Sequence, residues 1–331
     1  MKILSVIGTR PQYIKIKPIF DFCKKNTINH QIADTRQHYS HNVSGALIEN
    51  LNLSIDYSLN LSWTNELDFI SKCLKTLGEL YEAEQPDLII VYGDTNSTLC
   101  AALAAYKLRI PLAHVEAGER CFDLSVPEEL TRRLVDDASK YNFCSSVGAV
   151  KNLPNGIFCG DLEYELLNQL NPDIAFQDFG VMTIHRQANS NPKSLMRILS
   201  LCGRIPFDIK FYVHHRVRPF LPGSIPSNVK ILDPCIYTDM IGQLSKCSFI
   251  ITDSGSIQKT SPFFGKRTLV MREKSEWKKT ETENYAKLVE FSENDIPWLL
   301  NGAVNRNKIF YLNELSVGLP SGIIIAGVGG V

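Results

Sequence analysis

Short, continuous apolar runs recur along the first half of the chain, and longer amphipathic segments separate them. Residues 3–8 (ILSVIG), 88–93 (LIIVYG) and 110–116 (IPLAHVE) each have the pattern of a buried strand. Each run ends in glycine or an acidic residue, and a segment with helical character follows it. This succession of strand, turn and helix predicts an open α/β sheet of parallel strands.

The same rhythm restarts after residues 168–180 (NQLNPDIAFQDFG), which are mostly polar, contain proline and glycine, and predict a linker. We therefore expect an N-terminal Rossmann-like domain over 1–168, a second Rossmann-like domain over 169–303, and a C-terminal helix and tail over 304–331. Further strands are expected at 179–185, 207–215, 229–233, 248–253 and 267–272.

Length and charge narrow the class of partner. A chain of 331 residues exceeds what one hydrophobic core usually supports, which agrees with two domains. Lys plus Arg and Asp plus Glu number 35 each, so net charge favours neither nucleic acid nor an anionic membrane as a partner. No apolar run approaches the roughly 20 residues of a membrane span. Nine cysteines without a CxxC pair, and an N-terminal apolar run too short for a signal peptide, predict a cytoplasmic location.

Three carboxylates follow strand ends or open a helix in the first half. Asp94 follows one strand, Glu116 ends the next, and Glu128 comes after Pro127 at a helix start. Each has a structural explanation as a helix cap or first-turn acid. Because strand ends of a parallel sheet meet at one edge, we expect all three in one active-site crevice.

Cations and histidines accompany these acids. Arg10 and Lys15 lie in and just after the first glycine turn, where a helix N-terminus suits a phosphate or carboxylate. His38 follows a further expected strand at 30–35 (HQIADT). In the second half, His185 and His214 follow strand ends, and Ser254-Gly255-Ser256 precedes a helix whose N–H groups could hold a diphosphate.

Taken in order, the motifs resemble the non-hydrolysing UDP-N-acetylglucosamine 2-epimerase family, from residue 2 to about residue 286. The motifs that carry the resemblance are GTRPQxIK (8–15), RQHYS (36–40), YGDTNST (92–98), HVEAGER (114–120), VPEExxRRLxD (126–136), HR (185–186), TDSGSIQK (252–259) and FFGKRTLVMR (263–272). The resemblance implies the GT-B fold, with two Rossmann-like domains facing a central cleft, and a homodimer.

The resemblance also implies a reaction. A base removes the C2 proton of a UDP-linked 2-acetamido sugar, UDP leaves to give a 2-acetamidoglucal, and UDP adds back after reprotonation on the other face, without metal or redox cofactor. The matching catalytic positions are Asp94, Glu116, Glu128 and His185. The matching binding positions are Arg10, Lys15, His38 and Arg132 in the first half and His214, Ser254, Gly255, Ser256 and Arg272 in the second.

Some positions depart from the family pattern. Thr260 stands where the family has a glutamate that looks like the anchor of the ribose hydroxyls. Ala188 replaces the acid of the family's HRxEN motif. Tyr237 and Met240 are both candidates to pack on uracil. The likeness fades after residue 286, and residues 307–315 are the candidate for the family's returning C-terminal helix. Several stretches are closer to relatives that act on modified sugars, so the sugar stays open.

Three alternatives remain beside a non-hydrolysing epimerase that supplies a polysaccharide or glycan precursor. The chain could hydrolyse its substrate and release free sugar and UDP. It could bind a UDP-sugar without turnover, since Thr260 and Ala188 replace acids. A GT-B glycosyltransferase fits on fold grounds, although fold does not determine chemistry. Which carboxylate acts on which face of the sugar is also undecided.

Overall fold

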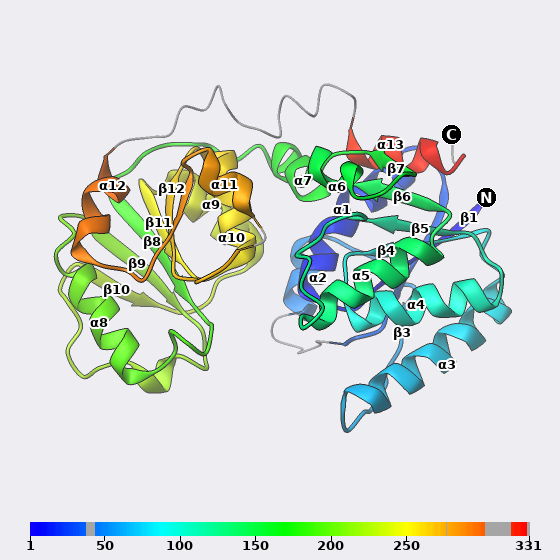
Figure 1. Ribbon diagram of the computed structural model, residues 1–331, viewed down its shortest axis with the longest axis horizontal. Helices are drawn as coiled ribbons and strands as arrows, with labels where there is room; N and C mark the ends of the chain where they lie inside the picture. The colour runs from blue at the N-terminus through cyan, green and yellow to red at the C-terminus, as the bar shows by residue number, and fades with distance from the viewer. Residues whose placement is uncertain (38–43, 276, 302–318, 330–331) are drawn as a thin grey trace. The chain divides into compact units, whose positions relative to one another are not determined.

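The computed structural model describes residues 1–37, 44–275, 277–301 and 319–329. The chain forms two compact units (Figure 1). The first comprises Met1–Leu170 and the C-terminal segment that carries the last helix, and the second begins at Asn171. No helix in the described ranges is both long and apolar enough to cross a bilayer.

The first unit is built on a seven-stranded parallel sheet with the order β3-β2-β1-β4-β5-β6-β7. Chain order reverses between β1 and β4, the place at the carboxyl edge where open α/β sheets form their ligand-binding crevice. The strands are β1 (Lys2–Ile7), β2 (Asn29–Asp34), β3 (Tyr57–Ser58), β4 (Leu88–Tyr92), β5 (Leu112–Val115), β6 (Tyr141–Cys144) and β7 (Gly156–Phe158).

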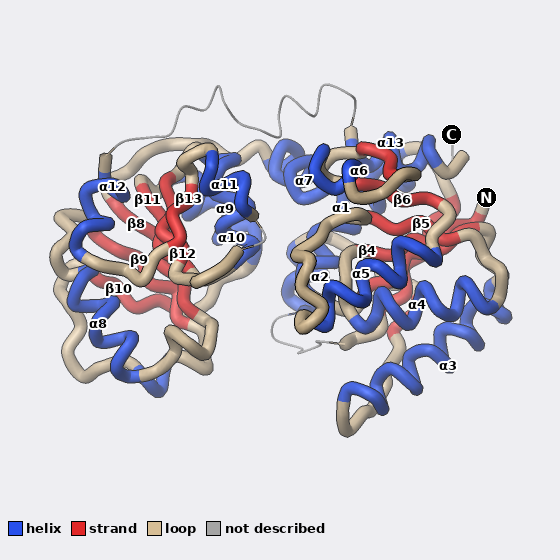
Figure 2. Tube along the Cα trace, viewed as in Figure 1, coloured by secondary structure: helices blue, strands red, loops and turns tan. Residues whose placement is uncertain are grey.

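Helices cover both faces of this sheet (Figure 2). Helix α4 is rich in alanine, and its buried Ala101 and Ala105 pack in one core cluster with Ile89 and Val91 of β4. Thr95 caps this helix by accepting a hydrogen bond from the Thr98 N–H. The helices are α1 (Arg10–Lys25), α2 (Ala46–Asn50), α3 (Glu66–Glu84), α4 (Asn96–Lys107), α5 (Pro127–Ala138), α6 (Val147–Lys151), α7 (Leu162–Leu170) and α13 (Pro320–Gly327).

Helix α13 packs on α1 and α7 of the first unit. The buried Glu165 carboxylate of α7 accepts hydrogen bonds from the Ser321 N–H at 2.8 Å and from its hydroxyl at 2.6 Å. Burial raises the pKa of Glu165, and the two Ser321 bonds oppose that rise. Within the expected C-terminal helix and tail, residues 320–327 thus form a docked helix, whereas the candidate returning helix at 307–315 lies outside the described residues.

The second unit repeats the parallel doubly wound plan with the order β10-β9-β8-β11-β12-β13, and chain order reverses between β8 and β11. Its core packs α8 against β8, β9 and β11. The strands are β8 (Phe179–Ile184), β9 (Asp208–Val213), β10 (Val229–Leu232), β11 (Phe249–Thr252), β12 (Arg267–Val270) and β13 (Ala286–Leu288). The helices are α8 (Pro192–Cys202), α9 (Tyr237–Lys246), α10 (Gly255–Thr260), α11 (Lys278–Thr282) and α12 (Ile296–Leu300). The predicted α/β class with two doubly wound parallel sheets is confirmed.

Candidate active site

The loop after β1 is tied to the end of β4 by one buried amide. The Gln12 side chain accepts hydrogen bonds from the N–H groups of Gly8 at 2.8 Å and Thr9 at 3.1 Å, and it donates to the Tyr92 carbonyl at 2.7 Å. This capping interaction starts α1 at the crevice edge of the sheet. It therefore fixes where the side chains of the first turns of α1, including Lys15, leave the helix.

Glu116 follows β5 and forms an ion pair with Lys15 across that crevice. The two side chains are 16% and 15% exposed, so the pair is largely shielded from water. Glu116 has a φ of 67°, in the left-handed region that a residue with a Cβ atom rarely adopts. Such a conformation costs about 1–3 kcal/mol and persists where the surrounding structure enforces it, often at functional sites.

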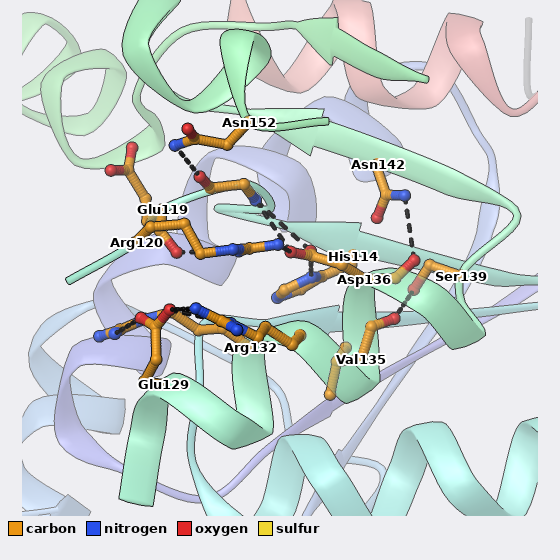
Figure 3. A network of polar contacts seen from close by, with 12 residues as sticks. His114, Glu119, Arg120, Glu129, Arg132, Val135, Asp136, Ser139, Asn142 and Asn152 are labelled. Atoms are coloured by element: carbon orange, nitrogen blue, oxygen red, sulfur yellow. Dashed lines mark hydrogen bonds and ion pairs between the residues drawn. The ribbon is translucent and has the colours of Figure 1, made fainter. Parts of the chain in front are cut away.

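Asp94 follows Gly93 at the end of β4 and forms an ion pair with Arg132 of α5. Arg132 has a second acidic neighbour, Glu129, whose fully buried carboxylate lies 3.5 Å from the guanidinium (Figure 3). Burial alone would raise the pKa of Glu129, but the Cys121 N–H and Arg133 outweigh it and lower the pKa. Arg132 is thus held between two carboxylates, only one of which is partly open to solvent.

The other predicted residues of the first unit lie around these pairs. Glu128 is exposed in the first turn of α5, and it precedes Arg132 by four residues, which places both on one side of the helix. Arg10 is the exposed first residue of α1. His38 lies outside the described residues. The structure therefore brings Asp94, Glu116, Lys15 and Arg132 to one edge of the sheet, with Glu128 one turn away on α5.

In the second unit, His185 and Asp253 follow the adjacent strands β8 and β11 and form a pair. The Nδ1 atom of His185 lies 2.8 Å from the buried Asp253 carboxylate, which also accepts hydrogen bonds from the N–H groups of His185 and Arg186 and from the Asn189 amide. Burial would raise the pKa of Asp253, but the bond and charge of His185, with the bonds from Arg186 and Asn189, lower it. The carboxylate fixes the ring with Nε2 as the nitrogen available to a ligand.

Ser254 caps α10, since its hydroxyl accepts a hydrogen bond from the Ile257 N–H. Gly255 and Ser256 form the first turn, where N–H groups have no acceptor within the helix. The hydroxyl of the buried Thr260 donates to the Ser256 carbonyl at 2.7 Å. This hydroxyl is thus bonded within α10, and Thr260 lacks the longer carboxylate side chain with which a glutamate would bind the ribose hydroxyls.

His214 and Arg272 complete the predicted residues of the second unit, at the ends of β9 and β12. The Nδ1 atom of His214 accepts a hydrogen bond from the Arg216 N–H at 3.3 Å. Arg272 is half-buried. These two side chains and the first turn of α10 follow strands of the same sheet, and all of them lie at its carboxyl edge.

Asp253 and Glu129 were not among the residues predicted for the site. Asp253 is adjacent to the predicted Ser254, and its signal was its place at the end of a buried strand. Glu129 follows the predicted Glu128, and the helical spacing of three and four residues to Arg132 and Arg133 was the signal that could have found it.

The model of the family described as UDP-N-acetylglucosamine 2-epimerase matches residues 21–310. The chain belongs to this family. Among epimerase relatives, a UDP-2,3-diacetamido-2,3-dideoxy-D-glucuronate 2-epimerase from Pseudomonas aeruginosa is 34% identical over 300 residues, which cover 84% of this chain and 85% of the relative. A UDP-N-acetylglucosamine 2-epimerase from Methanocaldococcus jannaschii is 31% identical over 310 residues, which cover 83% and 85%.

Solved epimerase structures share the fold. The UDP-GlcNAc 2-epimerase from Neisseria meningitidis, bound to UDP-GlcNAc, superposes with a TM-score of 0.83 at 26% identity over all of both chains. The M. jannaschii UDP-GlcNAc 2-epimerase, in complex with UDP-GlcNAc and UDP, gives a TM-score of 0.78 at 28% identity over 96% of this chain and all of that one. The family predicted from the motifs is therefore confirmed. The relatives named here are 2-epimerases, which are isomerases.

Proposed function

We propose that this chain is a non-hydrolysing 2-epimerase of a UDP-linked 2-acetamido sugar. The observation that carries the proposal is the placement of Asp94 and Glu116 at the ends of the neighbouring strands β4 and β5, each paired with a cation, in a chain of this family. A C2 proton is weakly acidic, so its removal needs a carboxylate held at a fixed position. The pairs with Lys15 and Arg132 meet this need.

The reaction breaks the C2–H bond, places that electron pair between C1 and C2, and releases UDP from C1 with the electrons of the C1–O bond. Reprotonation of C2 on the opposite face and attack of a UDP oxygen on C1 give the epimer. The first unit supplies the acids Asp94, Glu116 and Glu128 for the proton transfers. His185, oriented by Asp253, supplies a second type of proton-transfer group.

The second unit holds UDP in this proposal. The N–H groups of Gly255 and Ser256, the Ser254 hydroxyl, His214 and Arg272 offer hydrogen-bond donors and positive charge to the departing diphosphate. On the first unit, Arg10, Lys15, His38 and Arg132 contact the sugar or phosphates. Guanidinium groups suit phosphate because they can donate two parallel hydrogen bonds.

Two sugars are the first to test. The names of the relatives point to UDP-GlcNAc and to UDP-2,3-diacetamido-2,3-dideoxyglucuronate. The enzyme is incubated with each in deuterium oxide, and C2 deuterium incorporation and the C2 epimer are followed by NMR. Incorporation with retention of the UDP linkage supports the proposal. Free sugar with stoichiometric UDP indicates the hydrolysing alternative, and tight binding without exchange indicates a binding protein.

We also propose that the enzyme works as a cytoplasmic homodimer whose product enters polysaccharide or glycan synthesis, and that 1–168, 169–303 and 304–331 are its domains. Seven of the nine cysteines are buried, which suits a reducing compartment. Light scattering at micromolar concentration tests the dimer, and a monomeric mass would refute it.

A further inference from the structure

A buried carboxylate outside the proposed acid–base set connects all the elements that carry those acids. Asp136, in the last turn of α5, is fully buried. One carboxylate oxygen lies 2.7 Å from Nδ1 of His114, and the other lies 2.7 Å from the Arg120 guanidinium (Figure 3). His114 is in β5 and Arg120 is in the loop that follows it, so Asp136 holds α5 against this strand and its loop.

His114 extends the contact to β4. Its Nε2 atom lies 2.9 Å from the Gly93 carbonyl oxygen, in the residue before Asp94. A carbonyl oxygen can only accept, so Nε2 is the donor of this hydrogen bond. The side chain of His114 is fully buried, as is its partner. A continuous chain of hydrogen bonds therefore runs from α5 through β5 to the peptide that precedes Asp94.

Asp136 also holds the loop that carries Glu116. The Gly118 N–H points at the carboxylate, 3.3 Å from one oxygen, and the Gly118 carbonyl accepts a hydrogen bond from Asn152 at 2.8 Å. Gly118 has a φ of 79°, and a Cβ atom there would lie 2.4 Å from the Ala149 carbonyl oxygen. The loop is therefore tightly constrained two residues after Glu116, at the residue that contacts Asp136.

The third acid is placed by the helix itself. Glu128, Arg132 and Asp136 are spaced by four residues along α5, so they lie on one side of the helix. Arg132 pairs with Asp94 in the middle of this row. Anchoring the end of the row at Asp136 sets the rotation of α5, and with it the directions of Arg132 and Glu128.

We propose that Asp136, acting through His114 and Arg120, is the positioning residue that sets the mutual geometry of Asp94, Glu116 and Glu128. The inference rests on the proposed function of these acids. Misplacing a reacting group by about 1 Å can cost about 100-fold in rate. Loss of this anchor should therefore lower kcat strongly and change KM for the UDP-sugar much less, because the diphosphate contacts assigned to the second unit do not depend on it.

The first test compares Asp136→Asn with Glu165→Gln. Both variants neutralise a buried carboxylate of the first unit, and Glu165 holds α13 instead of the acid-bearing loops. We expect D136N to lose about 100-fold in kcat for C2 exchange, with KM within about 3-fold of wild type. E165Q should lose thermal stability but keep its kcat per folded molecule. Equal kcat losses in the two variants, or none in D136N, would overturn the proposal.

The two arms of His114 can be separated, which keeps the test decisive if D136N fails to fold. In His114→Gln the amide nitrogen replaces Nε2 and keeps the bond to Gly93, whereas in His114→Asn it replaces Nδ1 and keeps the bond to Asp136. Each variant lacks one link of the chain from α5 to Asp94, so each should lower kcat at least about 10-fold with little change in KM. Wild-type kcat per folded molecule in either variant would rule out positioning through His114.

Amide hydrogen exchange separates this inference from the proposed function. The Gly118 N–H is bonded to Asp136, so D136N should accelerate its exchange, and E165Q should not. If the wild type catalyses no C2 exchange with any UDP-2-acetamido sugar, the proposed function fails. Unchanged Gly118 exchange in D136N would refute the anchoring itself.

Discussion

The two sheets have the same strand topology, but different groups are paired at their carboxyl edges. In the first unit, the acids that follow β4 and β5 are paired with Arg132 and Lys15. In the second, the acid that follows β11 is buried and holds the imidazole of His185. One edge thus presents carboxylates fixed by cations, and the other presents a histidine fixed by a carboxylate.

The comparison teaches that the fold supplies the positions while the choice of partner sets which group is held there. Each sheet reverses chain order at one place, β1/β4 in one and β8/β11 in the other, and the paired groups lie at or beside these reversals. In the first unit, charge-assisted contacts to Lys15 and Arg132 fix the direction of two carboxylates. A carboxylate on Nδ1 selects the imidazole tautomer that leaves Nε2 as the working atom. The proposed proton transfers need groups of both kinds.

The largest effect should come from Glu116→Gln. The amide keeps the size of the side chain but cannot take a proton, so we expect C2 exchange to fall by about 10²- to 10⁴-fold. UDP affinity, measured by calorimetry, should stay within a few-fold of wild type. The control is Glu84→Gln, which also removes an ion pair with a lysine. That lysine is Lys2 at the start of β1, on the opposite edge of the sheet from Glu116. Exchange at the wild-type rate in E116Q would contradict the assigned role.

Asp253→Asn should have the next largest effect, because the amide no longer fixes the His185 ring. We expect kcat to fall about 100-fold. The folded-state pKa of Asp253 is lowered, so its stabilisation is fully present above the unfolded value of about 3.9 and is lost as pH falls through the folded pKa. The Tm difference between wild type and D253N should therefore shrink below about pH 4.

Asp295→Asn is the matched control for that measurement. Asp295 is also nearly buried in the second unit. Burial would raise its pKa, but Lys287 and Ser292 outweigh burial and lower the pKa. Its replacement should give a similar dependence of Tm on pH and full activity. A D253N enzyme with wild-type kcat would show that the His185 pair is only structural.

A smaller effect tests the conformation of Glu116. Glu116→Gly and Glu116→Ala both remove the Lys15 ion pair, but only alanine keeps a Cβ atom at a φ of 67°. We expect the glycine variant to be more stable by about 1 kcal/mol. Urea unfolding can be followed by Trp63, the one tryptophan of the first unit, after Trp277 and Trp298 are replaced by phenylalanine. Equal stability of the two variants would argue against strain.

The smallest effect should come from Thr260→Val. The Thr260 hydroxyl donates to the Ser256 carbonyl, so its loss should change UDP affinity by less than about 2-fold while costing about 1 kcal/mol of stability.

The matched comparison is Arg272→Gln, which should weaken UDP binding about 10-fold, because it removes a charge-assisted contact. A larger loss in T260V than in R272Q would mean that Thr260 does contact the ribose.

The sequence was sufficient for the longer strands and for the family, because buried parallel strands appear as apolar runs and the motifs keep their order. The short strands β3 and β13 were not predicted. The sequence could not supply the pairings. Lys15 and Glu116 are 101 residues apart, and they meet only because β1, β4 and β5 are adjacent in the sheet. Asp253 meets His185 for the same reason, through β8 and β11.

Helix rotation was a second limit. The sequence placed Glu128 and Glu129 together at the start of α5, but only packing decides that Glu129 is buried and Glu128 exposed. The position of the C-terminal helix was a further limit, because the sequence pointed to 307–315 and the helix lies at Pro320–Gly327. This segment forms α13 because Glu165 and the surfaces of α1 and α7 receive it.

The docking of α13 has a consequence for the order of events during synthesis. The second unit is an insertion between two parts of the first, since residues on both sides of it in the chain belong to one compact body. The domain whose strands leave the ribosome first therefore acquires its last helix only after the inserted domain has been made. A ribosome-bound chain stopped before residue 320 would present the α13-binding surface, with the Glu165 carboxylate, still uncovered.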